Sequence, residues 1–371
     1  MNCSIIIPNK NRADLIVALM ESLSHARAEY EGNTEVLIID DSDDKNKAII
    51  AEGAEKYDCI LVDKACSVAA KRNYGASLAK YDVLLFLDSD VRVLPSLLNE
   101  YAKVFRAKKA QAVVGALEFE GKRYWYWEVV KSTPFTKPFY MPKGMPELPW
   151  GCSCNIAVKK WLFDEVGGFS PDFKFPAGED VDFGLKISNG KHIKIYSAPE
   201  AVVFHSNETW RHYKEMKHRV SIYGKADVIL VDKHPKFVVD GGMFRRIIMY
   251  FVVLLTAIAA ALLIGNPWYL LAAPMFFIAE NLIISAMAKI SDSKYEKISL
   301  LQELAVQDLV HTNDWGFLSE CLRSKKPRSL NKQLIYSYGQ AFTTLSFRRK
   351  TIFIQLTLFM IMLMVFLIAV I

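Results

Sequence analysis

The first 240 residues alternate short apolar runs with stretches of helical spacing. Four runs of four to six residues, each bounded by a polar residue or a breaker, are typical of strands. They are Ser4–Ile7, Glu35–Ile39, Cys59–Val62 and Asp82–Leu87. Between them, apolar residues recur every three or four positions, which predicts helices over Asp14–Ala28, Lys45–Tyr57 and Ser67–Leu78.

This alternation predicts an α/β fold, with a parallel sheet covered by helices on both faces. Ligands of such sheets bind at the carboxyl ends of the strands. Four carboxylates follow the predicted strands directly: Asp40, Asp41, Asp88 and Asp90. We therefore expect acids from distant parts of the chain to meet at one edge of the sheet.

The last 130 residues carry three long apolar runs, over Ile247–Ile264, Trp268–Ala288 and Ile352–Ile371. Each is near the roughly 20 residues that a membrane-spanning helix requires. The segment between the second and third runs, residues 289–351, is amphipathic. We therefore expect a first domain over residues 1–232 and a helical transmembrane region over residues 233–371.

The net charge of +6 does not indicate nucleic-acid binding, because no basic stripe interleaved with aromatic residues is present. Instead, basic residues flank the apolar runs, at Arg245 and Arg246, at Lys289, Lys294 and Lys297, and at Arg348–Lys350. With three spans these flanks fall on one side, which the positive-inside rule makes cytoplasmic. The N-terminus lacks the features of a signal peptide. The sequence thus predicts a multi-pass protein of the cell membrane with its first domain in the cytoplasm.

Asp88-Ser89-Asp90 follows the apolar run Leu84–Leu87. Two carboxylates one residue apart repel each other, and a divalent cation would relieve that repulsion. Hard cations such as Mg²⁺ or Mn²⁺ favour carboxylate and phosphate oxygens together. Taken alone, the motif is more typical of an exposed, Asp-rich turn.

Further motifs stand in a fixed order around this one. They are Ser4–Arg12, Ile38–Asp44, Ala69–Gly75, Gly151–Asn155, Gly167–Phe169, Gly178–Lys186 and Ala201–His205. With Asp88–Asp90, residues 3–226 resemble the family 2 glycosyltransferases of the GT-A fold. The chain has Asn9-Lys10-Asn11 where that family usually has Thr-Tyr-Asn, and Asp40–Asp43 where it usually has Asp-Asp-Gly-Ser.

The resemblance implies a role for each matching residue. Pro8, Arg12, Asp41, Arg72 and Asp88 would bind the nucleotide sugar. Asp88, Asp90 and His205 would hold Mg²⁺ or Mn²⁺. Asp180 would be the general base, with Glu179 positioning the acceptor or Asp180.

These assignments imply a metal-dependent, inverting transfer of sugar from a nucleotide sugar to a hydroxyl of a lipid-linked or membrane-proximal acceptor. The Gln-x-x-Arg-Trp motif of processive synthases is absent, so we expect transfer of a single sugar. An alternative is a polyprenyl-phosphate glycosyltransferase, whose anionic acceptor needs no base. A nucleotidyltransferase and a non-catalytic membrane scaffold rank below both.

The motif His311–Phe317 lies in the predicted cytoplasmic segment. It could cover the active site or contact the acceptor, and the sequence leaves its role open. The sequence also leaves open the donor sugar, the nucleotide, the acceptor and the choice between Mg²⁺ and Mn²⁺.

Overall fold

The computed structural model describes residues 1–122, 124–133, 135–210, 212–240, 246–291, 298–335 and 341–370. Side chains are described for these residues except at 137, 209, 240, 288–291, 341–349 and 369–370. The chain divides into two compact units. The first comprises residues 1–123 and 134–215, and the second comprises residues 124–133 and 216–371.

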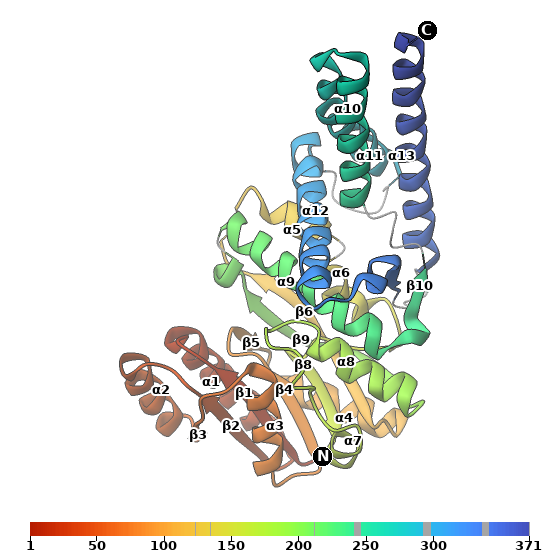
Figure 1. The fold of residues 1–371 in the computed structure, drawn as a ribbon. Helices are drawn as coiled ribbons and strands as arrows, with labels where there is room; N and C mark the ends of the chain where they lie inside the picture. Colours follow the sequence, from red (N-terminus) through yellow and green to blue (C-terminus); the bar gives the residue numbers. More distant parts are fainter. Residues whose placement is uncertain are drawn as a thin grey trace. The chain divides into compact units, whose positions relative to one another are not determined.

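The first unit is built on one mixed sheet (Figure 1). Within the described residues its strands follow the order β3-β2-β1-β4-β8-β6-β9-β5, and β7 pairs with β9. The strands are β1 (Cys3–Asn9), β2 (Thr34–Asp40), β3 (Ile60–Asp63), β4 (Val83–Leu87), β5 (Val91–Val93), β6 (Ala112–Glu120), β7 (Glu147–Leu148), β8 (Asn155–Lys159) and β9 (Ile195–Ser206).

The four predicted strands form the parallel half of this sheet, because β1 pairs with β2 and β4, and β2 with β3, all in parallel. The rest of the sheet is mixed in direction, which the expectation of a parallel sheet did not include. β8 runs antiparallel to both β4 and β6, and β5 runs antiparallel to β9. Antiparallel partners distant in sequence leave no local pattern, which is why the apolar runs could not reveal them.

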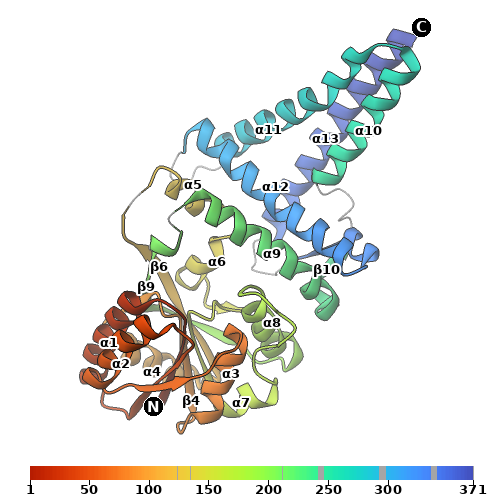
Figure 2. The ribbon, with the colours of Figure 1, turned by 60° about the vertical axis from the view of Figure 1, so that its left-hand side comes forward.

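Helices cover both faces of the sheet (Figures 1 and 2). The chain moves outward from β1 to β3 and then returns to β4 on the other side of β1. Because crossovers are right-handed, the connection that reverses direction lies on the opposite face from the first two. The helices of the first unit are α1 (Ala13–Ala28), α2 (Asp44–Lys56), α3 (Val68–Leu78), α4 (Leu97–Lys108), α6 (Lys137–Tyr140), α7 (Lys160–Glu165) and α8 (Glu179–Leu185). The reversal makes the carboxyl ends of β1 and β4 the topological switch point, where doubly wound sheets bind ligands.

The second unit is helical and contains α5 (Trp127–Ser132), α9 (Tyr213–Lys233), α10 (Arg246–Ile264), α11 (Ala272–Ser291), α12 (Leu300–Arg323) and α13 (Ala341–Val370). A short antiparallel pair joins β10 (Val238–Asp240) to β11 (Lys332–Leu334). Among the described residues, three segments are long and apolar enough to cross a membrane: Arg246–Ile264, Pro267–Met287 and Lys350–Ile368. They agree with the three predicted runs. Arg245, Lys294 and Lys297, and the side chains of Lys289, Arg348 and Arg349, lie outside what the structure describes.

The three apolar helices share a core formed by Met249, Val253, Ala257, Ala260, Phe276, Met362 and Phe366. Where α10 begins, that core gives way to a buried polar cluster. Arg246 donates to Glu280 at 2.8 Å and to Asn281 at 3.0 Å, and it also bonds Gln307 of α12. A buried charge needs such partners. The cluster therefore fixes α12 against α10 and α11.

The motif His311–Phe317 lies in the middle of α12, where it packs against α9. A Cβ atom on Gly316 would lie 2.1 Å from the Ser221 carbonyl oxygen, and one on Gly224 would lie 2.0 Å from that of Asn313. The two helix backbones therefore touch at these glycines. His311 hydrogen-bonds Asn281 at 3.0 Å, and burial, aided by Arg246, lowers its pKa to about 3. Packing within the second unit thus accounts for much of this motif.

Candidate active site

Asp88 and Asp90 occupy the turn between β4 and β5, at the carboxyl edge of the sheet. Strand pairing brings His205 to them, because Val91 lies opposite His205 in the β5–β9 ladder. The Ser206 amide donates to the Asp90 carbonyl at 2.8 Å and extends that ladder. Potential ligand atoms of Asp88, Asp90 and His205 all lie within 4.8 Å of one another.

The His205 imidazole is held in one orientation. Its Nδ1 lies 2.9 Å from the Ser206 carbonyl oxygen, which can only accept, so Nδ1 carries the proton. The Phe119 ring packs against it at 5.5 Å between centroids, and the Trp210 ring at 6.2 Å. The other ring nitrogen, Nε2, lies 3.4 Å from the Asp90 carboxylate. A second-sphere bond of this kind fixes a histidine for metal binding.

Arg72 links the Asp88 turn to α8. Its guanidinium is buried and donates to Asp88 at 2.7 Å and to Glu179 at 2.9 Å. Its face lies 5.3 Å from the centre of the Phe169 ring. Burial disfavours the charge, but the Asp88 and Glu179 carboxylates outweigh burial and raise the pKa of Arg72. Arg72 is therefore a fixed cation between two acids.

Glu179 and Asp180 form the first turn of α8, after Gly178 in a left-handed conformation (φ 86°). Burial and the Glu179 charge raise the pKa of Asp180 to about 7. Burial also raises the pKa of Glu179, although Arg72 opposes the shift. Asp180 can therefore take or release a proton near neutral pH.

Arg12 lies directly after β1 and reaches the same turn. Its guanidinium pairs with the Asp90 carboxylate at 2.8 Å. The Asp90 side chain is 3% exposed and that of Arg12 is 35% exposed. Both acids of the Asp88–Asp90 turn thus have an arginine partner.

Asp41 and Pro8 lie at the ends of β2 and β1. Pro8 pairs with Ile39 of β2. On the other side of β1, the pairing with β4 already ends at Ile6. Proline has no N–H to donate, and at this position β4 would not have accepted one. Lys71 and Lys10 both bond the Asp41 carboxylate, the latter at 3.0 Å. Burial opposes its ionisation, but these hydrogen bonds lower the pKa of Asp41.

Sequence reasoning missed Lys71, which is buried and also donates to the Asn9 carbonyl. Its position immediately before Arg72 was the only available signal. Asp40 was expected among the functional carboxylates, but its side chain is buried and hydrogen-bonds neighbouring side chains of the fold. It accepts from Asn9 at 2.8 Å and from the Ser42 hydroxyl at 2.6 Å.

The model of "Glycosyl transferase family 2" matches residues 4–167. The chain carries a family 2 glycosyltransferase domain. It is 28% identical over 226 residues to the O-antigen biosynthesis protein RfbC of Myxococcus xanthus, a match to 56% of this chain and 17% of that protein. It is 26% identical over 220 residues to an uncharacterized glycosyltransferase of Haemophilus influenzae, covering 56% and 69% of the two chains.

A mannosyltransferase from Pyrobaculum calidifontis, solved in complex with GDP-Man and Mn²⁺, shares the fold of the family 2 domain and its helical extension. The TM-score is 0.54 at 16% identity, over 85% of this chain and 86% of that one. This likeness confirms the expected GT-A architecture.

The Asp88, Asp90 and His205 cluster of the family 2 domain has the chemistry of a divalent-cation site. Two carboxylates and an imidazole are ligands that Mg²⁺ and Mn²⁺ accept. Mg²⁺ binds oxygen at about 2.1 Å, so opposite ligands are about 4.2 Å apart, and small side-chain rotations would close the present spacing. The residues therefore fit the cation that the family implies.

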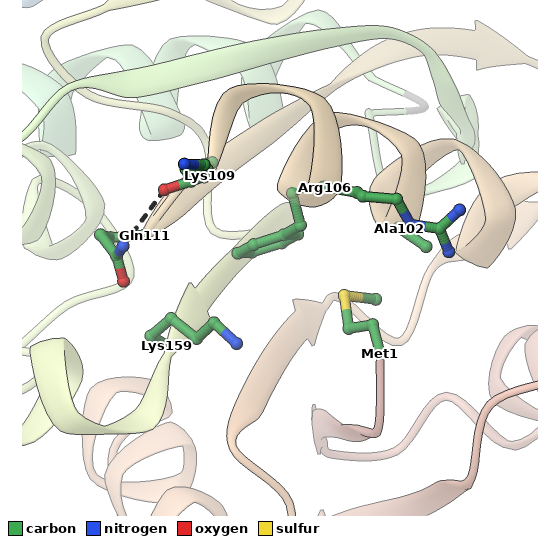
Figure 3. Close-up of a pocket in the computed structure, with 8 residues that line it drawn as sticks. Met1, Ala102, Arg106, Lys109, Gln111 and Lys159 are labelled. Carbon is green, nitrogen blue, oxygen red and sulfur yellow. Dashed lines mark hydrogen bonds between the residues drawn. The ribbon is translucent and has the colours of Figure 1, made fainter.

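A separate hollow of about 330 Å³ lies at the amino-terminal ends of β1 and β4, opposite the Asp88 turn (Figure 3). It is lined by Met1, Ala102, Phe105, Arg106, Lys109, Ala110, Gln111 and Lys159. Arg106 and Lys109 stand at the carboxyl end of α4, where basic residues offset the helix dipole. These two basic side chains of the hollow therefore have a structural explanation.

Proposed function

We propose that this protein is an inverting, metal-dependent glycosyltransferase that moves one sugar from a nucleotide sugar to a hydroxyl of a lipid-linked or membrane-proximal acceptor. The observation that carries the proposal is the convergence of Asp88, Asp90 and His205 at the carboxyl edge of a family 2 domain. Half-buried Asp180 and the cation of Arg72 adjoin this cluster.

The donor would lie at the carboxyl ends of β1 and β4. Asp41, held by two lysines, and Pro8 would meet the nucleoside, while Arg12 and Arg72 would face the diphosphate. The fold relative from Pyrobaculum calidifontis, with its GDP-Man and Mn²⁺, supports a donor of this class. Bound Mg²⁺ or Mn²⁺ would supply a Lewis acid that stabilises the charge growing on the leaving diphosphate.

Asp180 would accept the proton of the acceptor hydroxyl while that oxygen attacks the anomeric carbon on the face opposite the diphosphate. One bond forms as the sugar–phosphate bond breaks, so the anomeric configuration inverts. Glu179 would orient Arg72, its partner at 2.9 Å, rather than touch the acceptor. Asp180 is then the catalytic base and Glu179 a positioning residue.

The second unit supports an acceptor of this class. Three candidate spans continue the chain beyond the family 2 domain, and we place that domain at the cytoplasmic face of the cell membrane. A soluble donor would there meet an acceptor held in the bilayer.

The test uses the purified full chain in detergent, supplied with membrane lipid extract and a panel of nucleotide sugars with Mn²⁺ or Mg²⁺. Release of nucleoside diphosphate is measured with and without EDTA. We expect release from one donor class, dependent on the lipid extract and abolished by EDTA. Release from no donor under either metal would contradict the proposal.

A further inference from the structure

Each carboxylate of the candidate metal site is already paired with a guanidinium. Arg72 bonds Asp88 at 2.7 Å, and Arg12 bonds Asp90 at 2.8 Å. A divalent cation bound by the same two acids would lie close to both arginines. Like charges at such distances repel strongly where water is scarce.

The two arginines differ in their freedom to move. Arg72 is fixed by two acids and an aromatic face, and its side chain is 3% exposed. The Arg12 side chain is 35% exposed and is tied to Asp90. The Arg12 backbone is held in place, because its carbonyl oxygen accepts a hydrogen bond from the Ile16 amide in the first turn of α1. Among the residues that the structure describes, its side chain has no anchor of the kind that holds Arg72.

We propose that Arg12 occupies Asp90 until a nucleoside diphosphate arrives, and so makes metal binding depend on the bound nucleotide. The cation and Arg12 compete for one carboxylate. A diphosphate offers Arg12 another anion, and a guanidinium matches phosphate oxygens with two parallel hydrogen bonds. When Arg12 turns to the diphosphate, Asp90 is released to the metal.

This inference rests on the proposed function, since it assumes that the cluster binds a metal together with a nucleotide. It adds an order of events: the nucleotide comes first or together with the metal. It also gives Arg12 a role at the metal site, where the sequence pointed only to the nucleotide pocket.

The test measures Mn²⁺ binding to the full chain in detergent by electron paramagnetic resonance, alone and with UDP or GDP. For the native protein we expect weak binding of Mn²⁺ alone and at least ~10-fold tighter binding with the preferred nucleotide, within the usual range of coupling between two ligands. In Arg12→Gln, we expect Mn²⁺ alone to bind about 10-fold more tightly and the gain from nucleotide to shrink.

Two further variants separate this role from general charge and folding effects. Arg12→Lys keeps a cation beside Asp90 and should retain weak binding of Mn²⁺ alone. Arg92→Gln removes an arginine that pairs with Glu120 at 2.7 Å on the exposed side of β5, and should leave Mn²⁺ binding unchanged.

Unchanged or weaker binding of Mn²⁺ alone by Arg12→Gln, in a chain that still binds Mn²⁺ with nucleotide, would overturn the inference and leave the proposed function standing. If the native chain binds no Mn²⁺ even with nucleotide, both the inference and the metal-dependent function are wrong. Equal tightening in Arg92→Gln would also overturn the role of Arg12.

Discussion

At the scale of single residues, Asp180 shows how burial prepares a carboxylate for acid–base work. Its pKa is raised to about 7, first by burial and then by the neighbouring Glu179 charge. An ordinary aspartate is almost fully ionised at neutral pH and is a weak base. Asp180 holds its proton more firmly and is suited to accept one from a hydroxyl.

Because the base must be ionised, the rate should rise with pH through the pKa of Asp180 and level off above about 7. Below it, kcat/KM should fall about tenfold per pH unit. Asp180→Asn should lower kcat by about 10²–10⁴-fold, the usual contribution of a general base. Asp164→Asn, at an exposed position on α7, is the matched control.

The prediction for Asp180 depends on the chemical class of the acceptor. A lipid phosphate is already an anion and needs no base. If Asp180→Asn retains most of its activity and the profile is flat near pH 7, a hydroxyl acceptor is wrong and the polyprenyl-phosphate alternative is favoured.

The sequence predicted the chemical types in the site better than their contacts. Arg72, Asp88, Asp90 and His205 were all named from motifs, and the structure brings them together. The bond between Arg72 and Glu179 joins residues 107 positions apart, and no periodicity predicts such a contact. Lys71 was missed for the same reason, since its partner Asp41 lies 30 positions away.

At the scale of elements, strand pairing aligns the site. Backbone hydrogen bonds fix the register of the β5–β9 ladder, and this register sets His205 beside Asp90. Apolar runs revealed β1 to β4 correctly. They could not reveal that β5, only three residues long, pairs with a strand about a hundred residues later.

Contact between α9 and α12 depends on two glycines. Gly224→Ala or Gly316→Ala would place a methyl group about 2 Å from a backbone oxygen, and backbone cannot rotate away as a side chain can. Each change should cost about 1–3 kcal/mol, the usual range for overpacking. The measurement is thermal unfolding in one detergent.

Gly190→Ala is the control, because no atom lies within 4 Å of its added Cβ. If Gly224→Ala and Gly316→Ala unfold at the same temperature as Gly190→Ala, then α9 and α12 do not pack through these glycines.

At the scale of the whole molecule, three spans would place the two ends of the chain on opposite sides of a membrane. Three spans were predicted from the length and apolar composition of three runs. The helices of the structure agree with these runs, because candidate spans are recognised by the same two properties. Sidedness depends on basic flanks and remains a prediction. The boundary at residue 232, between a first domain and a transmembrane region, also remains a prediction.

Reporter fusions test this topology. A reporter active only in the cytoplasm should work when fused at the N-terminus and fail when fused after Ile371. A reporter active only outside should show the reverse. Activity of the same reporter at both ends would exclude three spans.

The central claim is that Asp88, Asp90 and His205 bind a metal that holds a nucleotide. The most direct measurement is calorimetric binding of UDP and GDP to the full chain in detergent, with Mn²⁺ and with EDTA. We predict that one nucleotide binds only with Mn²⁺. Asp90→Asn should weaken that binding at least ~10-fold, because losing even a side chain that only supports a metal ligand typically costs about 10–100-fold. Asp63→Asn, at the exposed acid that ends β3 and pairs with Lys47, should bind as the native chain does. Equal nucleotide binding with Mn²⁺ and with EDTA, unaffected by Asp90→Asn, would contradict the account.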